Sequence, residues 1–487
     1  MKYLRLNPQY TIRNEKNCSF IVKLQDQIDK DVPKVGNSFF VLPPFIGYIL
    51  SNIGKKSYPS TLQEMSAILH VKESSLSFFV NQLLNSGTRE MNIKTEKILL
   101  PEKLLVYSDT IDERKYYTCP NFSYQDAFQV HRPNIPLNVT FMVTTKCTTN
   151  CIYCYAKRQG YKEFSTSEII KIIQECKEIG VVNLALTGGD IFSRPDWKEI
   201  LSYTFKVGYH PFLSTKTILA FEELKYLRSI GVKEIQFSLD SLNAEVLSRM
   251  IGRTDDYVGK VRCMFKNCEK NNINISVRTV ATCINSDVAN FRMLYDFLSN
   301  FKNIKDWVIT PAFLSEFKQE VNEYKPNIQS LASIGEFIKT CQKIFPIYLN
   351  KFSSRGYKLK QYKTVEQFVA NNQICPANSF MMAILPSGTC TPCEMLYENP
   401  NYIIGNLNDS SIGEIWNSKK ALGLFAPKQD DFNGKDTVCS SCKVFQKCRT
   451  GINKRICLVD ISKTMGNDHG DFPDPKCPKS IIENVIL

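Results

Sequence analysis

The sequence lacks the features that mark secreted and membrane proteins. It has no long uninterrupted apolar run and no low-complexity tract, and its N-terminus, MKYLR, has no apolar core of a signal peptide. The apolar stretch at residues 39–50 contains Pro43 and Pro44 and is too short to cross a bilayer. These absences argue against a secreted or membrane-spanning protein, and they predict a cytoplasmic protein without membrane contact.

Cysteine, in contrast, is abundant. The 487 residues include 18 cysteines, and eight of these fall between Cys375 and Cys477. In a reducing compartment, clustered cysteines bind metal more often than they form disulfides. The length predicts two or three domains. The formal charge of +13 favours an anionic partner, which a nucleic acid, an acidic peptide or an acidic electron-carrier protein would satisfy equally well.

The densest cysteine group is Cys147, Cys151 and Cys154, spaced C-x3-C-x2-C directly after the apolar, β-branched run 137–144. Three thiolates this close can hold three irons of a [4Fe–4S] cube, which leaves one iron without a protein ligand. A partial zinc site, which would need a fourth ligand, and three ordinary buried thiols are the alternatives. The context further along the chain favours the cube.

This spacing resembles the radical S-adenosylmethionine (SAM) enzymes. In that family the cofactor chelates the vacant iron through its amino and carboxylate groups. A Gly-Gly-Glu sequence after the second strand binds the methionine amino group. Here Gly188-Gly189-Asp190 stands in that place, with Asp190 in the position of the family's Glu. The resemblance implies that the cysteine motif generates a 5′-deoxyadenosyl radical and that Gly188, Gly189 and Asp190 contact the cofactor.

Residues 136–345 alternate strand-like and helix-like segments six times. This alternation predicts an α/β fold, a partial (β/α)6 TIM-like barrel of parallel strands with helices outside. The expected strands are 137–144, 181–186, 211–214, 233–239, 273–280 and 307–310, and the expected helices are 165–179, 196–206, 221–230, 256–271, 288–301 and 334–344. Loops at the C-terminal strand ends form the site in such folds, and the cysteine motif occupies the first of them.

Five further residues are candidates for cofactor contacts. Ser214, Ser238 and Asp240 lie at strand ends, where hydroxyls and a carboxylate can hold a ribose and the methionine carboxylate. The family resemblance adds Tyr153, beside the adenine, and Arg253, a basic residue that organises the site. Asp240 could instead cap the next helix, and Arg253 could be a solvated surface side chain.

Residues 1–90 are predicted to form a winged-helix-like module. Strands are expected at 3–6, 19–24 and 38–42, followed by helices at 44–53, 61–69 and 74–86. Leu6-Asn7-Pro8 before a strand, the helix with 60–64 and the run 78–84 resemble the peptide-recognition element of enzymes that modify ribosomally made peptides.

In that family a leader peptide adds a strand to the sheet edge. A DNA-binding winged helix is the alternative, but the attached domain favours a peptide, so nucleic acid is not the expected partner. Residues 91–135 are expected to be an irregular, polar connector.

Residues 375–487, reached through a bridging helix at 346–374, resemble the SPASM auxiliary-cluster domain of radical enzymes that act on peptides and proteins. The match includes a hairpin at 381–393 and a helix at 411–416. The resemblance implies an outer [4Fe–4S] cluster on Cys439, Cys442, Cys448 and Cys477 and an inner cluster on Cys375, Cys393 and Cys457.

The fourth ligand of the inner cluster is open. Cys390 is the natural candidate, although Cys390 and Cys393 are not distinguished by the sequence, and one inner iron without a protein ligand would accept a substrate thiolate. Two zinc ribbons, from Cys390-x2-Cys393 and Cys439-x2-Cys442, are the alternative for this region.

Together the three resemblances imply a radical SAM maturase of ribosomally made peptides. It would install a crosslink in a precursor peptide, a thioether as first choice and a carbon–carbon bond as second, and would receive electrons from a flavodoxin or ferredoxin. A sulfatase-maturase-like enzyme that oxidises proteins is one alternative. A winged-helix regulator that senses redox state through iron–sulfur clusters is the other. Formation of 5′-deoxyadenosine would separate an enzyme from a regulator.

Overall fold

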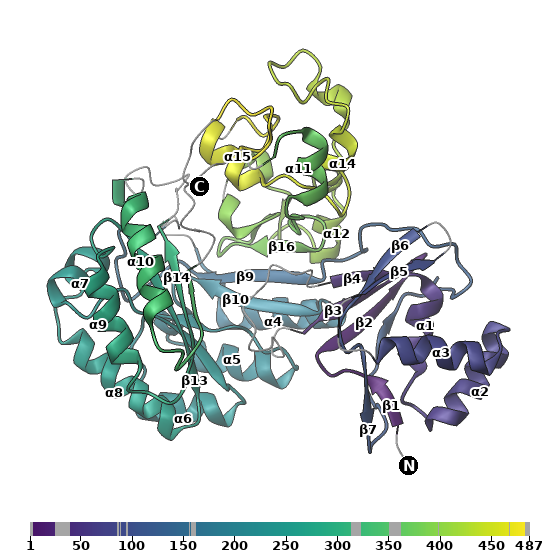
Figure 1. Cartoon of the computed structure of the whole chain (residues 1–487), viewed down its shortest axis with the longest axis horizontal. Helices are drawn as coiled ribbons and strands as arrows, with labels where there is room; N and C mark the ends of the chain where they lie inside the picture. Colours follow the sequence, from purple (N-terminus) through teal and green to yellow (C-terminus); the bar gives the residue numbers. More distant parts are fainter. Residues whose placement is uncertain are drawn as a thin grey trace. The chain divides into compact units, whose positions relative to one another are not determined.

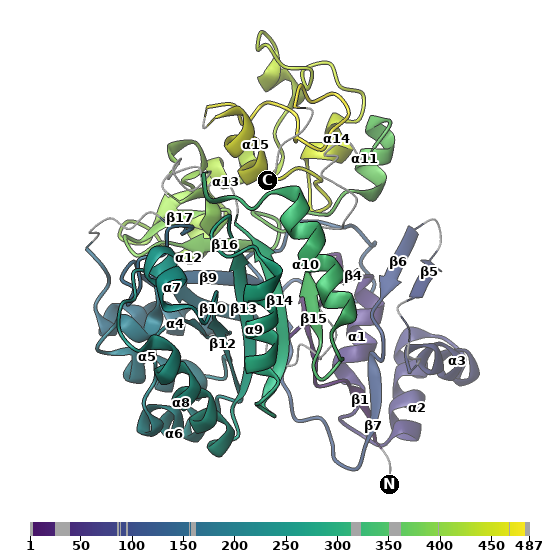
Figure 2. The ribbon, with the colours of Figure 1, turned by 60° about the vertical axis from the view of Figure 1, so that its left-hand side comes forward.

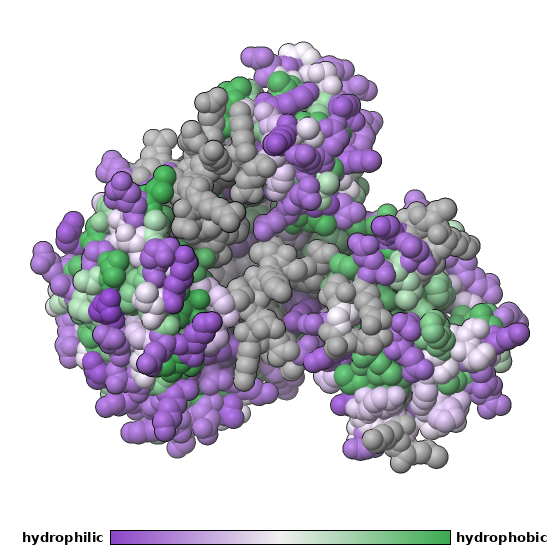
Figure 3. Space-filling model, viewed as in Figure 1, coloured by the Kyte–Doolittle hydropathy of each residue, from purple (hydrophilic) through white to green (hydrophobic). Residues whose placement is uncertain are grey.

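The computed structural model describes residues 3–24, 39–84, 87, 89–93, 96–154, 156, 162–312, 323–349, 362–397, 399–466 and 468–482. The chain divides into two compact units, Met1–Leu137 and Asn138–Leu487, and each is considered by itself (Figure 1). On the face shown in Figure 3, hydrophilic residues cover most of the described surface, with small hydrophobic patches between them. Within the described residues, every helix is too short or too polar to span a membrane.

The N-terminal unit combines small sheets with three helices. Its strands are β1 (Tyr3–Leu6), β2 (Tyr10–Glu15), β3 (Cys18–Lys23), β4 (Phe39–Leu42), β5 (Arg89–Ile93), β6 (Glu96–Leu100), β7 (Leu105–Ser108) and β8 (Tyr117–Thr118). The helices are α1 (Pro44–Asn52), α2 (Tyr58–Leu69) and α3 (Glu73–Leu83). The main sheet has the order β4-β3-β2-β8, and the core contains Leu6, Ile21, Leu42 and Ile46.

The three helices are confirmed, but the strand prediction for this unit was incomplete. β2 was missed, although it forms a hairpin with β3 in which Asn17 takes a left-handed conformation (φ 67°) that asparagine tolerates in a tight turn. Although 109–116 and 119–135 contain no helix or strand, the expectation of an irregular segment at 91–135 is wrong for its first part. β5 and β6 form a hairpin there, β7 pairs with β1, and β8 extends the main sheet.

The second unit begins with alternating parallel strands and helices, which confirms the α/β fold class. The strands are β9 (Asn138–Thr144), β10 (Asn183–Gly188), β11 (Ser214–Thr215), β12 (Glu234–Ser238), β13 (Asn274–Ala281), β14 (Ile304–Pro311) and β15 (Ile347–Leu349). The helices are α4 (Thr166–Glu178), α5 (Trp197–Lys206), α6 (Phe221–Ser229), α7 (Ala244–Ile251), α8 (Tyr257–Lys270), α9 (Val288–Leu298) and α10 (Ile328–Thr340). The helices lie outside the strands in both views (Figures 1 and 2).

These strands form two parallel ladders, β10-β9 and β11 through β15 in sequence order. Helix α4 shows why the helices cover them. Ser165 and Glu168 form a capping box at its start, and Ile169, Ile172, Ile173 and Cys176 recur every three or four residues and are buried. Helix α7 was not predicted, and α10 begins six residues before the expected start at 334.

The cysteine-rich segment continues the sheet of the first ladder. Its elements are β16 (Met381–Ile384), β17 (Thr389–Thr391), β18 (Gly405–Asn406), α12 (Ile412–Trp416), α13 (Lys419–Phe425), α14 (Phe445–Arg449) and α15 (Leu458–Met465). The predicted hairpin is present, and β16 pairs in parallel with β9, giving the order β10-β9-β16-β17-β18. In the bridging segment, α11 (Val365–Asn371) follows β15, and residues 350–361 lie outside the described residues.

Candidate functional site

The cysteine turn follows β9 and is held by backbone bonds from α7. Cys151 is buried, while Cys147 and Cys154 are partly exposed. The amide of Asn150 donates to the Ile251 carbonyl and that of Ile152 to the Met250 carbonyl, both at 2.9 Å. The C-terminal end of the unpredicted helix α7 therefore fixes the backbone on either side of Cys151.

The glycine pair packs directly against the same turn. The Gly189 amide donates to the Thr144 carbonyl and the Asp190 amide to the Lys146 carbonyl, both at 2.7 Å. A Cβ on Gly188 would stand 2.2 Å from the Thr144 oxygen, and one on Gly189 would stand 2.0 Å from the Lys146 oxygen. The glycines were expected to let the backbone approach a ligand, and the structure gives them a second task, which is to let β10 touch the cysteine turn.

The Asp190 carboxylate is buried and bonded to the protein. Oδ2 accepts hydrogen bonds from Thr215 Oγ1 at 2.6 Å, Thr217 Oγ1 at 2.9 Å and the Lys216 amide at 3.2 Å. Oδ1 accepts from the Phe192 amide at 3.1 Å. This carboxylate joins the ends of β10 and β11, between which no strand ladder forms in the described part of the chain.

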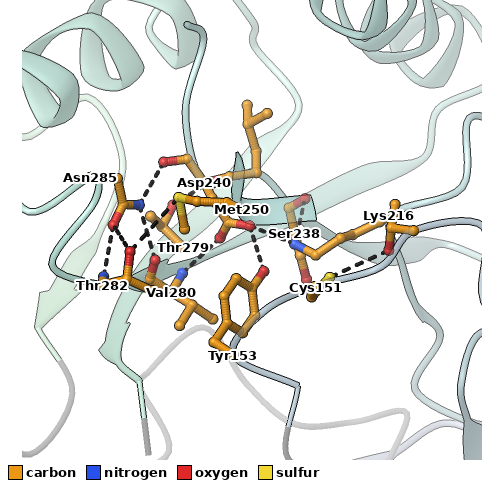
Figure 4. A network of polar contacts seen from close by, with 12 residues as sticks. Cys151, Tyr153, Lys216, Ser238, Asp240, Met250, Thr279, Val280, Thr282 and Asn285 are labelled. Atoms are coloured by element: carbon orange, nitrogen blue, oxygen red, sulfur yellow. Dashed lines mark hydrogen bonds and ion pairs between the residues drawn. The ribbon is translucent and has the colours of Figure 1, made fainter. Parts of the chain in front are cut away.

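Asp240 is a hub that connects the ends of β11, β12 and β13 with the cysteine turn (Figure 4). Its side chain is fully buried. Oδ2 accepts from Tyr153 Oη at 2.5 Å and from Lys216 Nζ at 2.9 Å, and Oδ1 accepts from the Val280 amide at 2.9 Å. Burial, followed by the charge of Asp240, raises the pKa of Tyr153 well above its ordinary value, so the phenol stays a donor. Through this Tyr153 hydrogen bond, the turn between Cys151 and Cys154 is attached to the buried Asp240 carboxylate.

Asp240 does not cap a helix. The side chain of Asn243 caps α7, and the Asp240 carbonyl accepts from Asn285 Nδ2 at 2.9 Å and Asn290 Nδ2 at 3.1 Å. The sequence analysis missed Lys216 as a site residue. The signal was its place after Ser214-Thr215 at a strand end, because a lysine there can reach a buried carboxylate on the neighbouring strand.

The remaining cofactor candidates are spread around this hub. Ser214 is exposed on β11, while its neighbour Thr215 points inward. Ser238 is partly buried and accepts from Gln236 Nε2 at 3.0 Å. Arg253 pairs with Asp255 at 2.8 Å and donates to the Thr148 carbonyl at 3.4 Å, so it lies against the cysteine turn. Arg278 on β13 pairs with Asp306 at 2.6 Å.

Three thiols in the C-terminal segment form what we call the inner group: Cys375, Cys393 and Cys457. Burial, and then the charge of Glu394, raises the pKa of the Cys393 thiol well above its ordinary value, and the charges of Cys375 and Cys457 raise it further. Cys393 and Cys457 also pack on the same apolar cluster of Leu396, Tyr402 and Val459. These three cysteines come from distant points of the chain.

Four thiols form the outer group: Cys439, Cys442, Cys448 and Cys477. They line one pocket together. Burial raises the pKa of Cys448 to about 12, with contributions from Cys477 and Cys439. Asp474 lines the same pocket, and its Oδ2 accepts a hydrogen bond from the Cys457 amide of the inner group at 2.9 Å.

The structure does not place Cys390 with the inner group. Its side chain is fully buried on β17, with Sγ 3.5 Å from the Gly388 carbonyl. Burial and then the charge of Glu175 raise the pKa values of both Cys390 and Cys176 on α4, and the proximity of Cys390 raises that of Cys176 further. The thiol thus faces the helix side of the sheet, which corrects its proposed role as fourth inner ligand.

The donor sets fit iron–sulfur clusters. No three His, Cys, Asp or Glu side chains in the described ranges are placed to hold one metal ion. In a cube, however, each thiolate binds a separate iron, so the relevant donors are three thiols in one turn, three in the inner group and four in the outer group. The three-thiol turn has the donor number of a cube with one open iron.

Comparisons with known proteins agree with these sites. Residues 141–288 match the Radical SAM superfamily, and residues 375–443 match the SPASM iron–sulfur cluster-binding domain. The subtilosin biosynthesis protein AlbA of Bacillus subtilis is 25% identical over 375 residues, covering 70% of this chain and 76% of AlbA. A GTP 3′,8-cyclase of Clostridium perfringens is 29% identical over 147 residues, 28% of this chain and 44% of the relative, so the chain spans under half the length of that relative.

A solved structure with the same fold is that of Streptococcus suis SuiB bound to its precursor peptide SuiA. It has a TM-score of 0.62 and 13% identity and covers 97% of this chain and 99% of SuiB. The chain therefore contains a radical SAM domain, which binds S-adenosylmethionine and an iron–sulfur cluster, followed by a SPASM iron–sulfur cluster-binding domain.

Proposed function

We propose that this protein is a radical SAM maturase that installs a crosslink in a ribosomally made precursor peptide. The observation that carries the proposal is the cysteine turn of Cys147, Cys151 and Cys154, packed against Gly188-Gly189 and tied to Asp240 at the C-terminal strand ends. The turn stands in the same unit as the inner and outer thiol groups. An oxidative crosslink needs one centre that generates a radical and an acceptor for the surplus electron. The cysteine turn would be the first, and the inner and outer thiol groups would provide the second.

The protein's own residues prepare the radical centre. Cys147, Cys151 and Cys154 would hold a cube with one open iron, and bound S-adenosylmethionine with the reduced cube would supply a 5′-deoxyadenosyl radical that abstracts hydrogen from the peptide. Backbone contacts from Gly189 and α7 keep the turn in place. Asp240 and Lys216 fix Tyr153 beside it, which limits motion of the centre during the reaction.

Cofactor contacts are proposed for the residues that surround the turn. Ser238, Arg253 and Tyr153 lie near the cysteine turn or the Asp240 hub, as the bonds described above require. Asp190 would act mainly by joining β10 to β11, since its carboxylate already accepts four hydrogen bonds. Ser214 is the weakest candidate because its side chain is exposed beside the inward-facing Thr215.

A peptide substrate is supported by the relatives and by the N-terminal unit. Relatives include AlbA, named for subtilosin biosynthesis, and the PqqA peptide cyclase of Bradyrhizobium diazoefficiens, which is 31% identical over 123 residues. SuiB, which shares the fold, was solved with its precursor peptide. In the N-terminal unit β4 stands at one end of the main sheet, where a leader peptide could add a strand.

The crosslink is proposed to be a thioether first and a carbon–carbon bond second. In either case the peptide loses two hydrogens. The radical abstracts one of them as a hydrogen atom. The other leaves as a proton, and the peptide gives up one surplus electron. The inner and outer thiol groups would hold two auxiliary clusters that take this electron, and a flavodoxin or ferredoxin would supply the electron that starts the reaction. Cys390 would not be a ligand, because its thiol is buried on β17 beside Cys176 of α4.

The test uses the full chain, reconstituted anaerobically and mixed with S-adenosylmethionine, dithionite and the precursor peptide encoded beside its gene. We expect 5′-deoxyadenosine and a peptide that has lost two hydrogen atoms. A thioether consumes a cysteine thiol, so iodoacetamide would no longer label that cysteine, whereas a carbon–carbon bond leaves it reactive. A protein that forms 5′-deoxyadenosine but leaves every such peptide unchanged would contradict the maturase proposal.

A further inference from the structure

Arg449 connects two segments that carry thiols of the outer group. It is the last residue of α14 and only 3% exposed. Its Nη2 donates to Cys439 Sγ at 3.4 Å. The same guanidinium donates to the carbonyls of Gly470 at 2.9 Å, Asp471 at 3.2 Å and Phe472. These bonds hold the Cys439 segment against the stretch that leads to the fourth outer thiol.

The guanidinium also brings a permanent positive charge beside the thiol group. Arginine stays protonated under all ordinary conditions, and its planar fork of donors can serve several acceptors at once. Arg449 lines the cavity that contains Cys439, Cys442, Cys448 and Cys477. Hydrogen bonds to the sulfurs and nearby charge are among the factors that set the reduction potential of an iron–sulfur cluster.

We propose that Arg449 is a positioning residue of the outer auxiliary cluster, which holds Cys439 in place and makes that cluster easier to reduce. The inference rests on the proposed function, because it requires a cluster on the outer thiol group. A reduced cluster carries one more negative charge than the oxidised one, so a buried cation that donates to a ligand sulfur stabilises the reduced form more. Removing it is expected to lower the equilibrium constant for one-electron reduction about tenfold, or about 59 mV.

Lys435 provides a matched control. Its ammonium stands 5.4 Å from the Phe432 ring centre, while the Arg449 guanidinium stands 5.2 Å from the same ring. Lys435 is exposed, however, and water screens its charge. Lys435→Met therefore removes a cation from the same neighbourhood without removing the bond to Cys439.

The experiment compares Arg449→Met, Arg449→Lys and Lys435→Met in the full, anaerobically reconstituted protein. Iron is counted, and the clusters are titrated with dithionite and followed by electron paramagnetic resonance. The outer-cluster signal is the one that disappears in Cys442→Ala. We expect Arg449→Met to shift this signal about 59 mV more negative, Arg449→Lys to shift it less, and Lys435→Met to leave it unchanged.

Loss of about four irons in Arg449→Met, with retention in Arg449→Lys, would also support the proposal, through the holding of Cys439. An Arg449→Met protein with normal iron and a normal outer potential would overturn it. Loss of all iron from both Arg449 variants would show a general folding role and would overturn it as well. If the wild-type protein has no signal that depends on Cys442, the outer cluster itself is refuted, and this result needs no Arg449 variant.

Discussion

The cysteine turn and the C-terminal thiol groups both bring several thiols together, the first within one turn of the chain and the second from distant segments. Cys147, Cys151 and Cys154 come from one eight-residue turn, so their spacing alone brings the thiols together. The inner group joins Cys375, Cys393 and Cys457, which only tertiary structure can assemble. A local site needs support mainly for its orientation, whereas an assembled site depends on every contact that holds its segments together.

The supports differ accordingly. The turn is fixed by backbone contacts at Gly189 and by the buried hub at Asp240. In the outer group, side chains do part of this work: Arg449 and Thr437 each bond the segment at 470–472, and Arg449 also donates to Cys439. Damage beside the turn should therefore change cofactor binding while leaving the other clusters intact, and damage in the C-terminal segment should do the reverse.

The largest effect is expected for Gly189→Ala. Its Cβ would stand 2.0 Å from the Lys146 oxygen, so the cysteine turn would have to move. We expect loss of about four irons and of 5′-deoxyadenosine formation, with the C-terminal clusters retained. Gly413→Ala is the control, because nothing lies within 4 Å of its added Cβ. Normal 5′-deoxyadenosine formation by Gly189→Ala would contradict the claim that the backbone contact at Gly189 holds the cysteine turn in place.

A smaller but still large effect is expected for Lys216→Met, which leaves the buried Asp240 carboxylate without its cation. The two charges lie 2.9 Å apart with side-chain exposures of 11% and 0%. Breaking such a pair from one side costs about 3 to 5 kcal/mol, and removing both charges costs less. We expect weaker S-adenosylmethionine binding in a filtration assay and a lower melting temperature, both partly restored in Lys216→Met/Asp240→Asn.

The exposed pair Lys260–Asp255, at 2.5 Å, supplies the control for Lys216. Lys260→Met should change stability by under about 1 kcal/mol because water screens that pair. If the double variant at 216 and 240 is no better than Lys216→Met, the ion pair is not what holds the hub.

A modest effect is expected for Glu175→Ala. Glu175 Oε1 accepts the Ile412 amide at 2.7 Å and so joins α4 of the radical SAM domain to α12 of the SPASM segment. Loss of this bond should cost about 1.5 kcal/mol in the free energy of unfolding, measured by urea denaturation. Glu178→Ala on the same helix is the control, and an equal loss in both variants would remove the special role of Glu175.

The smallest effect is expected for Cys390→Ala. Because Cys390 faces α4 and not the inner group, the variant should retain the wild-type iron content and cluster spectra. Cys393→Ala, three residues away, should lose the inner cluster. Loss of about four irons in Cys390→Ala would restore Cys390 as an inner ligand.

Sequence reasoning predicted what lies close together in the chain. The cysteine spacing, the glycine pair after the second strand and the alternation of strands and helices are local patterns, and each marks an element that the structure contains. The hairpin of β16 and β17 and the helix α12 were expected for the same reason. The division of the C-terminal thiols into an inner and an outer group came from the family resemblance, which supplied the long-range information, and it stays a prediction.

The direction in which individual side chains point could not be predicted from the sequence. Ser214 was preferred over Thr215 and Lys216, because alternation along a two-residue strand has no readable phase. Cys390 and Cys393 could be separated only once β17 was known to end at Thr391. The hairpin of β2 and β3 was missed since its turn signal is a single asparagine. Helix α7 was missed because it is only eight residues long and offers few periodic positions.

The most direct test of the account is the iron content of the reconstituted protein, measured together with 5′-deoxyadenosine formation. The wild type should bind about twelve irons and form 5′-deoxyadenosine, and Cys147→Ala/Cys151→Ala/Cys154→Ala should bind about eight and form none. Replacing all four outer cysteines by alanine should also leave about eight irons but preserve 5′-deoxyadenosine. Zinc in place of iron, or unchanged 5′-deoxyadenosine without the three-cysteine turn, would contradict the account.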